Sequence, residues 1–223
     1  MANRTKIKAM ATQLGFGTIT NSQLKELNIG NLDYLEHILG QELESRKQNA
    51  IAKVKKFCNL PNIKFGKDRL NRGLQYQVEK LLGGEWVNRS ENLLIIGACN
   101  TGKTALAVYL TSNAIEKGLK AFYIKQEELL TVVKQNEVLP KVSAIFNKIR
   151  NADLLVLDEV LYLNISPENL ELLYKTVMFI NDTTSIVFIT NREISEWLKF
   201  NEDKYTIRLL IDRALSNAET VRL

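Results

Sequence analysis

The residues best suited to chemistry lie in one short run near the middle of the chain. It reads GACNTGKT, from Gly97 to Thr104, and fits the spacing GxxxxGK(S/T). In such a loop, backbone N–H groups surround phosphate oxygens, a lysine such as Lys103 adds positive charge, and a hydroxyl such as that of Thr104 can bind Mg²⁺. A side chain in place of Gly97 or Gly102 would block close approach or a positive φ. We therefore predict a nucleotide phosphate site made by Gly97, Ala98, Cys99, Asn100, Thr101, Gly102, Lys103, Thr104 and Ala105.

Polar residues also end two later apolar runs. The first run, ADLLVLDEV, covers residues 152–160. Carboxylates beside a buried strand are costly unless they are paired or bind a metal, so we expect Asp158 to hold Mg²⁺ with Thr104 and Glu159 to deprotonate a water molecule. Asn191 follows the second run, residues 184–190, and suits a residue that senses a terminal phosphate or positions water. The alternatives are a capped strand end for the acids and an ordinary turn for Asn191.

The flanking sequence predicts the elements that position these residues. Apolar residues 93–96 predict a buried strand before the loop, and residues 105–118 predict a helix after it. Further strands are expected at 120–124, 152–160 and 184–190. Helices are expected at 73–88 (broken at Gly83 and Gly84), 126–136, 140–150, from Ser166, 193–200 and 205–216. This alternation predicts an α/β fold with a parallel sheet, in which ligands bind at the carboxyl ends of the strands.

The excess positive charge lies ahead of this region. Residues 1–80 hold 14 Lys and Arg against 7 Asp and Glu, whereas residues 81–223 hold 16 against 18. The basic part predicts helices at 1–19, 22–27 and 31–54 and ends at Pro61. It favours a nucleic acid partner, with Lys53, Lys55 and Lys56 as candidate contacts, although a solvated basic helix without a partner is the alternative. We predict a helical module at 1–61, a basic linker at 62–72, where Phe65 and Gly66 would lie near a nucleotide base, and an ATP-binding domain at 73–223.

The overall composition excludes several classes of protein. Hydrophobic residues make up 45% of the chain, which is enough for a core, and no apolar run approaches 18 residues. The N-terminal residues are polar and mixed and do not resemble a signal peptide. Cys58 and Cys99 lack the spacing of a metal site, and His37 is the single histidine. We expect a cytoplasmic protein in a reducing compartment, without a membrane partner.

Taken together, these motifs resemble those of the IstB/DnaC family of AAA+ ATPases. The matching segments are YLEHILGQELESRKQNAIAKVKKFCNLP, ENLLIIGACNTGKTALA, ADLLVLDEVLYL, ITNREISEW and LLIDRALSNA. The resemblance implies a P-loop AAA+ core without a helical lid, preceded by a small all-α module, with ATP and Mg²⁺ as ligands. It assigns Lys103, Glu159 and Asn191 to the catalytic machinery. It also makes Arg213, or secondarily Arg208, the arginine finger that reaches ATP in a neighbouring subunit.

The same resemblance implies a homo-oligomer with ATP at its subunit interfaces, assembled on double-stranded DNA. The partner would be a transposase, which the protein would help, or a replicative helicase, which it would load. Cys99-Asn100 and residues 214–217 depart from the family pattern. Two other classes stay open: a P-loop kinase for small molecules, and a DNA-binding module with a vestigial nucleotide site. Glu159 as a base for water argues against the first, and intact Lys103, Thr104 and Asp158 argue against the second.

Overall fold

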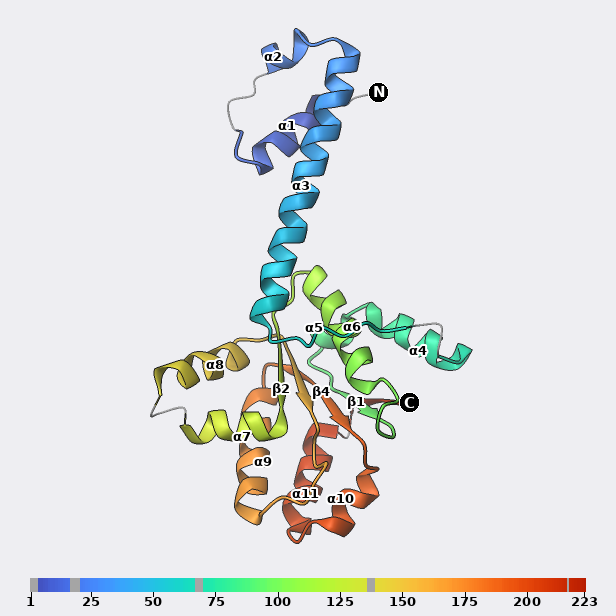
Figure 1. The fold of residues 1–223 in the computed structure, drawn as a ribbon, viewed down its shortest axis with the longest axis vertical. Coiled ribbons are helices and arrows are strands. Elements are labelled where there is room, and N and C mark those ends of the chain that lie inside the picture. Colours follow the sequence, from blue (N-terminus) through green and yellow to red (C-terminus); the bar gives the residue numbers. More distant parts are fainter. Residues whose placement is uncertain (1–3, 17–20, 67–69, 136–138, 216) are drawn as a thin grey trace. The chain divides into compact units, whose positions relative to one another are not determined.

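The computed structural model describes residues 4–16, 21–66, 70–135, 139–215 and 217–223 (Figure 1). The helices are α1 (Arg4–Gln13), α2 (Asn21–Lys25), α3 (Ile29–Phe57), α4 (Arg72–Leu82), α5 (Glu85–Asn88), α6 (Lys103–Glu116), α7 (Gln126–Gln135), α8 (Pro140–Arg150), α9 (Pro167–Asn181), α10 (Ile194–Phe200), α11 (Lys204–Leu210) and the π-helical turn η2 (Ile211–Leu215). The strands are β1 (Leu93–Ile96), β2 (Ala121–Lys125), β3 (Leu154–Asp158), β4 (Ser185–Thr190) and β5 (Glu219–Arg222). Within these described ranges no helix is long and apolar enough to cross a membrane.

The chain divides into two compact units, Met1–Lys53 and Val54–Leu223, with the division inside α3. In the described part of the first unit, α1, α2 and the first half of α3 bury a small apolar core, made by Ile7, Ala11, Leu14, Leu24, Leu32 and Leu39. Gly15, with φ 88, ends α1, and Arg46 donates a hydrogen bond to the carbonyl of Leu14 at 3.2 Å. The predicted functional boundary at residue 61 and the linker at 62–72 stay predictions, and residues 67–69 lie outside the described part.

The second unit is built on a parallel sheet. The strand order is β2-β3-β4-β1-β5, and each neighbouring pair is parallel. Residues 93–96 and 154–157 are fully buried, as the sequence predicted from their apolar character. Because all strands run in the same direction, the carboxyl ends of β1, β3 and β4 lie along the same side of the sheet. The loop after β1, the acids at the end of β3 and Asn191 after β4 therefore lie together at these carboxyl ends.

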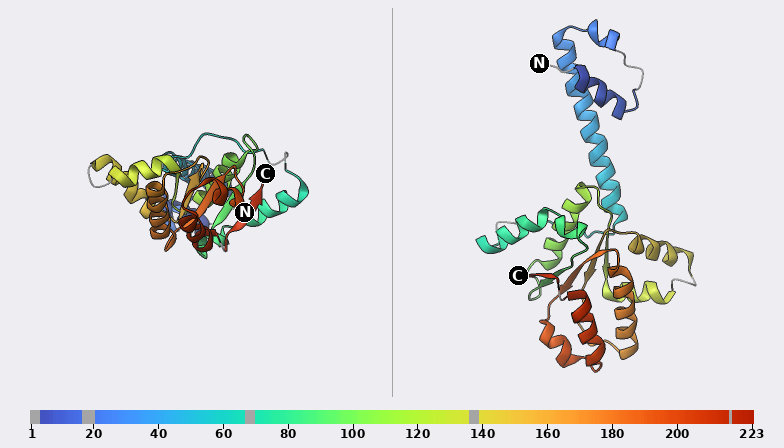
Figure 2. Two further views of the ribbon diagram at one scale, coloured as in Figure 1. Left: turned by 90° about the horizontal axis from the view of Figure 1, so that it is seen from below. Right: turned by 180° about the vertical axis from the view of Figure 1, so that it is seen from behind.

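Helices cover both faces of the sheet, as the two views in Figure 2 show. Alternate strand residues such as Ile124, Leu157 and Phe188 pack with residues of α7 to α11 in the main hydrophobic core. The other set of alternate residues faces α6, which contacts β1, β2, β3 and β4. Tyr123 and Asp158 belong to this second set, on the side where α6 begins.

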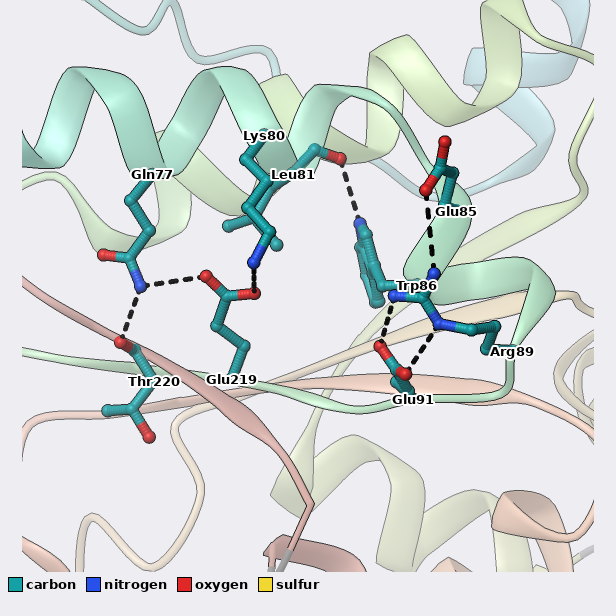
Figure 3. Close-up of polar contacts among 9 residues, drawn as sticks. All are labelled: Gln77, Lys80, Leu81, Glu85, Trp86, Arg89, Glu91, Glu219 and Thr220. Atoms are coloured by element: carbon teal, nitrogen blue, oxygen red, sulfur yellow. Dashed lines mark hydrogen bonds and ion pairs between the residues drawn. The ribbon is translucent and has the colours of Figure 1, made fainter.

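The fifth strand, β5, was missed by the sequence prediction, which assigned no element after residue 216. Its residues pair with β1 over the whole length of that strand, from Leu93 opposite Glu219 to Ile96 opposite Arg222. Helix α4 holds it from outside: the Gln77 amide donates to Glu219 Oε1 at 3.1 Å and to the Thr220 carbonyl at 3.0 Å (Figure 3). The sequence ETVR contains no apolar run that would predict a strand. An edge strand such as β5 is only partly buried, so most of its residues can be polar.

The helix starts and breaks agree with local sequence signals. Asn71 caps α4 by accepting a hydrogen bond from the Leu74 N–H at 2.9 Å. Gly83 and Gly84 separate α4 from α5, as predicted, and Gly84 has a left-handed backbone with φ 77. Ser166 caps α9, with a proline at the first helical position. These signals fix where the helices that flank the sheet begin.

Candidate functional site

The loop between β1 and α6 brings together the predicted phosphate-binding residues. A Cβ atom at Gly97 would meet the carbonyl oxygen of Leu223 and would lie 2.8 Å from Thr101 Oγ1. Gly102 has φ 98 with open space around it, and Asn100 also has a positive φ of 64. The two glycines thus have different purposes, close packing at Gly97 and a left-handed backbone at Gly102, as the sequence predicted.

The positive charge of Lys103 lies over this loop. Its Nζ donates a 2.6 Å hydrogen bond to the Ala98 carbonyl, which also accepts one from Thr101 Oγ1 at 3.0 Å. Partial burial lowers the pKa of Lys103, and the nearby Asp158 carboxylate opposes this effect. Because α6 begins at Lys103, the positive end of the helix dipole and the ammonium group act on the same small region. This arrangement favours an anion with several oxygens, such as a phosphate chain.

Asp158 is the polar centre of the site, with 4% of its surface exposed. Its Oδ2 accepts hydrogen bonds from Thr104 Oγ1 at 2.8 Å and from the Tyr123 hydroxyl at 2.7 Å. Its Oδ1 accepts the Glu159 backbone N–H at 2.7 Å. The Thr104 oxygen keeps lone pairs for a cation while its proton is donated to Asp158. One carboxylate and one hydroxyl fit Mg²⁺, which takes few protein ligands when substrate phosphates supply others.

Glu159 follows β3 in an unusual backbone conformation. Its φ is 58, and Leu161 has φ 49, so the chain turns sharply after the strand. The turn is held by the hydrogen bond from the Leu161 N–H to Gln126 Oε1 at 2.9 Å. The Glu159 carboxylate is half-exposed and lies 2.8 Å from Lys125 Nζ, an ion pair that raises the pKa of Lys125. Glu159 is therefore held at the cavity by a lysine from the neighbouring strand end.

Asn191 lies directly after β4, beside the loop. Its Nδ2 lies 3.6 Å from Cys99 Sγ, while its Oδ1 is buried and has no hydrogen-bond partner among the described residues. A single cavity of about 280 Å³ collects the predicted residues from three strand ends; its lining is Cys99, Asn100, Lys103, Thr104, Asp158, Glu159, Tyr162, Ile189, Thr190 and Asn191. The structure thus places candidate phosphate, metal and water-activating groups around one space.

A second cavity adjoins the other side of the loop. It is lined by Lys64, Phe65, Gly66, Leu70, Asn71, Leu74, Asn100, Thr101, Gly102, Ala105 and Leu223. The Phe65 ring stacks on Tyr109 with 5.3 Å between ring centroids and 26° between planes. Asn100 lines both cavities, so they meet at the loop. An aromatic wall beside a phosphate-binding loop suits a planar base.

Comparison with known proteins identifies the family. A family model described as IstB-like ATP binding protein matches residues 2–223. The chain belongs to this family. This IstB-like chain is 29% identical over 226 residues to a protein of Bacteroides fragilis named for an IS21-like insertion sequence and for ATP binding; the match covers 100% of the chain and 85% of the relative. It is 25% identical over 223 residues to a similarly named protein of the insertion sequence IS232 in Bacillus thuringiensis subsp. berliner, with 98% and 88% covered.

Solved structures show the fold of the IstB-like chain. The DnaC helicase loader matches with a TM-score of 0.57 and 15% identity, over 74% of this chain and 95% of the loader. Domain III of the replication initiation protein DnaA from Thermotoga maritima matches with a TM-score of 0.55 and 22% identity, over 73% of this chain and 67% of that one. These likenesses show the fold, a parallel sheet flanked by helices, and confirm the predicted α/β fold class.

Two arginines predicted from the family resemblance lie elsewhere on the IstB-like chain. Arg213 is exposed on η2, and Arg208 is exposed on α11. Neither lines the cavity that holds Asp158. A finger that acts on a neighbouring subunit has to be exposed, so the assignment of Arg213 stays a prediction.

The sequence reasoning missed Tyr123 and Lys125, which contact Asp158 and Glu159. Both lie on β2, where Tyr123 is opposite Val156 and Lys125 is opposite Asp158. Their contacts depend on the register between β2 and β3, which the sequence alone does not give. The available signal was a phenol and an ammonium group near the end of the strand expected at residues 120–124.

Proposed function

We propose that this IstB-like chain hydrolyses ATP at the cavity between β1, β3 and β4. The observation that carries the proposal is the hydrogen bond from Thr104 to the buried Asp158, in a cavity that also holds Lys103, Glu159 and Asn191. Phosphates bind along the loop and the start of α6, where Lys103 neutralises part of their charge. Thr104 and Asp158 hold Mg²⁺, which stabilises charge on the phosphates when bound.

Glu159 supplies the base for hydrolysis. Its carboxylate accepts a proton from water as the water oxygen bonds to the γ-phosphorus, and the bond from that phosphorus to the ADP oxygen breaks. Asn191 lines the same cavity, where its amide can orient the water or a γ-phosphate oxygen. A half-exposed glutamate near the metal carboxylate supports water as the acceptor over a metabolite hydroxyl.

The base of the nucleotide fits the second cavity. Phe65 and the apolar side chains of Leu70 and Leu74 would contact its faces, and Asn71 also lines this cavity. This supports the sequence-based placement of Phe65 and Gly66 near the base. Within the part of the chain that the structure describes, the lining residues include no acidic side chain that would repel the negatively charged nucleotide.

We propose that the active form is an oligomer assembled on double-stranded DNA. Arg213, or secondarily Arg208, would reach ATP bound to a neighbouring subunit, so that hydrolysis depends on assembly. The basic residues 1–80 would bind DNA phosphates in the cytoplasm, with Lys53 and Lys56 among the candidates. Lys55 is a weaker candidate, because its Nζ lies 3.0 Å from Glu116 Oε1.

The partner proposed for this chain is a transposase. The relatives of this chain are named for insertion sequences, which supports a transposase over a replicative helicase. Mixing the chain with each candidate, with ATP and with ADP, tests the choice by co-sedimentation. ATP-dependent binding to a helicase loaded on DNA, with no binding to the transposase, would show that the partner is the helicase instead.

The main experiment measures the ATPase rate with and without double-stranded DNA, across protein concentrations. We expect the rate per subunit to rise with both. Glu159→Gln should bind ATP and assemble but hydrolyse at least about 100-fold more slowly, because general-base catalysis contributes about 10²–10⁴-fold. Glu171→Gln is the matched control, since Glu171 pairs with Lys175 on the surface of α9. A parent-like rate in Glu159→Gln would refute its role as base, and a rate independent of DNA and concentration would refute the assembly mechanism.

A further inference from the structure

Tyr123 connects the metal carboxylate to the outer edge of the sheet. It lies on β2, which among the described strands pairs only with β3, and the residue is 6% exposed. Its hydroxyl donates to the same oxygen of Asp158 that Thr104 contacts. With Tyr123 and Thr104 on Oδ2 and a backbone N–H on Oδ1, three donors fix the plane of the Asp158 carboxylate.

The backbone of Tyr123 is fixed from its other side. Its N–H donates to the Cys58 carbonyl at 2.9 Å, and its carbonyl accepts a hydrogen bond from Asn59 Nδ2 at 3.2 Å. These are the two backbone groups that point away from β3. Cys58 is 2% exposed and Asn59 has φ 58, so the chain makes a tight, packed turn directly after α3.

The end of α3 is itself anchored to the second unit. Lys55 pairs with Glu116 at the end of α6, and Lys148 of α8 lies 3.5 Å from the centre of the Phe57 ring. The last turn of α3, the turn at Cys58 and Asn59, and Tyr123 therefore form one continuous set of contacts that ends at Asp158. Helix α3 is also the covalent connection to the N-terminal unit.

We propose that Tyr123 is a positioning residue for the metal carboxylate, and that the turn after α3 holds Tyr123 in place. This inference rests on the proposed function of the site. The phenol orients Asp158 for Mg²⁺, and Asn59 keeps the phenol within reach. A displacement of the end of α3 would thereby change the affinity for Mg²⁺–nucleotide without touching the nucleotide.

The test is a Mg²⁺ titration of binding of a fluorescent ATP analogue, repeated in EDTA. Tyr123→Phe removes one hydroxyl, and we expect the Mg²⁺ midpoint to rise about tenfold, with binding in EDTA within about twofold of the parent. Asn59→Gly removes the amide and permits the same φ, so it should raise the midpoint about threefold. The double variant should be no worse than Tyr123→Phe, because both changes interrupt one series of contacts. Tyr174→Phe, which removes a phenol hydroxyl on α9, is the control and should match the parent.

The outcomes separate this inference from the proposed function. An unchanged Mg²⁺ midpoint in Tyr123→Phe, in a protein that binds Mg²⁺–ATP and melts like the parent, would overturn the positioning role alone. Effects of Asn59→Gly and Tyr123→Phe that add in the double variant would overturn the connection to α3. If the parent itself bound no nucleotide, the proposed function would fail and this inference with it. Asn59→Gly keeps every buried side chain, so the connection is testable even if Tyr123→Phe folds poorly.

Discussion

Replacing Lys125 with methionine would show whether its ion pair restrains the proposed base. Lys125 Nζ and Glu159 Oε1 are 2.8 Å apart, and the two side chains are 50% and 48% exposed. A half-exposed pair is worth at most about 1 kcal/mol after screening by solvent. That energy would keep Glu159 paired for about five-sixths of the time, since 1 kcal/mol corresponds to a factor of about 5. Methionine preserves the apolar stem and removes only the charge.

We expect Lys125→Met to raise the ATPase rate without DNA by up to about sixfold, because the free fraction of Glu159 rises from about one-sixth to one and Glu159 is then free to accept the proton from water. The affinity for ATP should not change, because Lys125 lines neither cavity beside the loop. The gain should shrink as salt rises, since salt weakens the pair in the parent. The assay is steady-state phosphate release at low and high salt. Lys175→Met, which breaks the exposed pair with Glu171 on α9, is the matched control.

A slower rate in Lys125→Met with unchanged ATP affinity would refute this reasoning. It would mean that the pair holds Glu159 in its working position. A gain far above about sixfold would show that the pair is stronger than its exposure allows. Both results would be read against the control, which should keep the parent rate.

The remaining predictions concern the loop, the core and DNA. Gly97→Ala should weaken ATP binding about 10-fold or more, because the new Cβ atom would meet the backbone of Leu223. The control is Gly118→Ala, at a positive φ with open space around it, which should lower the melting temperature without weakening ATP binding. Asn92→Ala should destabilise the second unit by about 2–4 kcal/mol in urea unfolding, because it leaves the buried Ala214 carbonyl and Ile186 N–H unpaired; a loss below about 1 kcal/mol would contradict this. DNA affinity should fall steeply between about 50 and 200 mM salt in a filter-binding assay, whereas a flat response would contradict phosphate contacts by the basic N-terminal part.

Short-range signals in the sequence predicted much of the site. The spacing of Gly97, Gly102 and Lys103 follows from the needs of a turn and an anion, and those needs are local. Asp158 and Glu159 were predicted to be functional because placing a charge next to a buried strand costs free energy unless the charge is paired or binds a metal. The breaks at Gly83 and Gly84 are likewise local. Each of these features can be read from a few consecutive residues.

Features that depend on distant partners were missed. The strand β5 has the sequence ETVR, and it is a strand only because β1 offers it an edge and Gln77 holds it. Tyr123 bonds to Asp158 because of the strand register, and its backbone is paired by Cys58 from far upstream. The contact between Cys99 and Asn191 likewise joins two strand ends, and it gives the unusual loop cysteine a neighbour that the sequence did not suggest.

The position of β5 also affects how the protein can mature during synthesis. Residues 219–223 support the loop of residues 97–102 from beside β1, yet the ribosome makes them long after that loop. Until they emerge, β1 has an open edge and Gly97 lacks the backbone against which it packs. The nascent chain would therefore acquire its full affinity for ATP only after β5 has been released from the exit tunnel. Under the proposed ATP-dependent assembly, a nascent chain would then be unable to assemble before β5 is made, which limits oligomers whose subunits lack this strand.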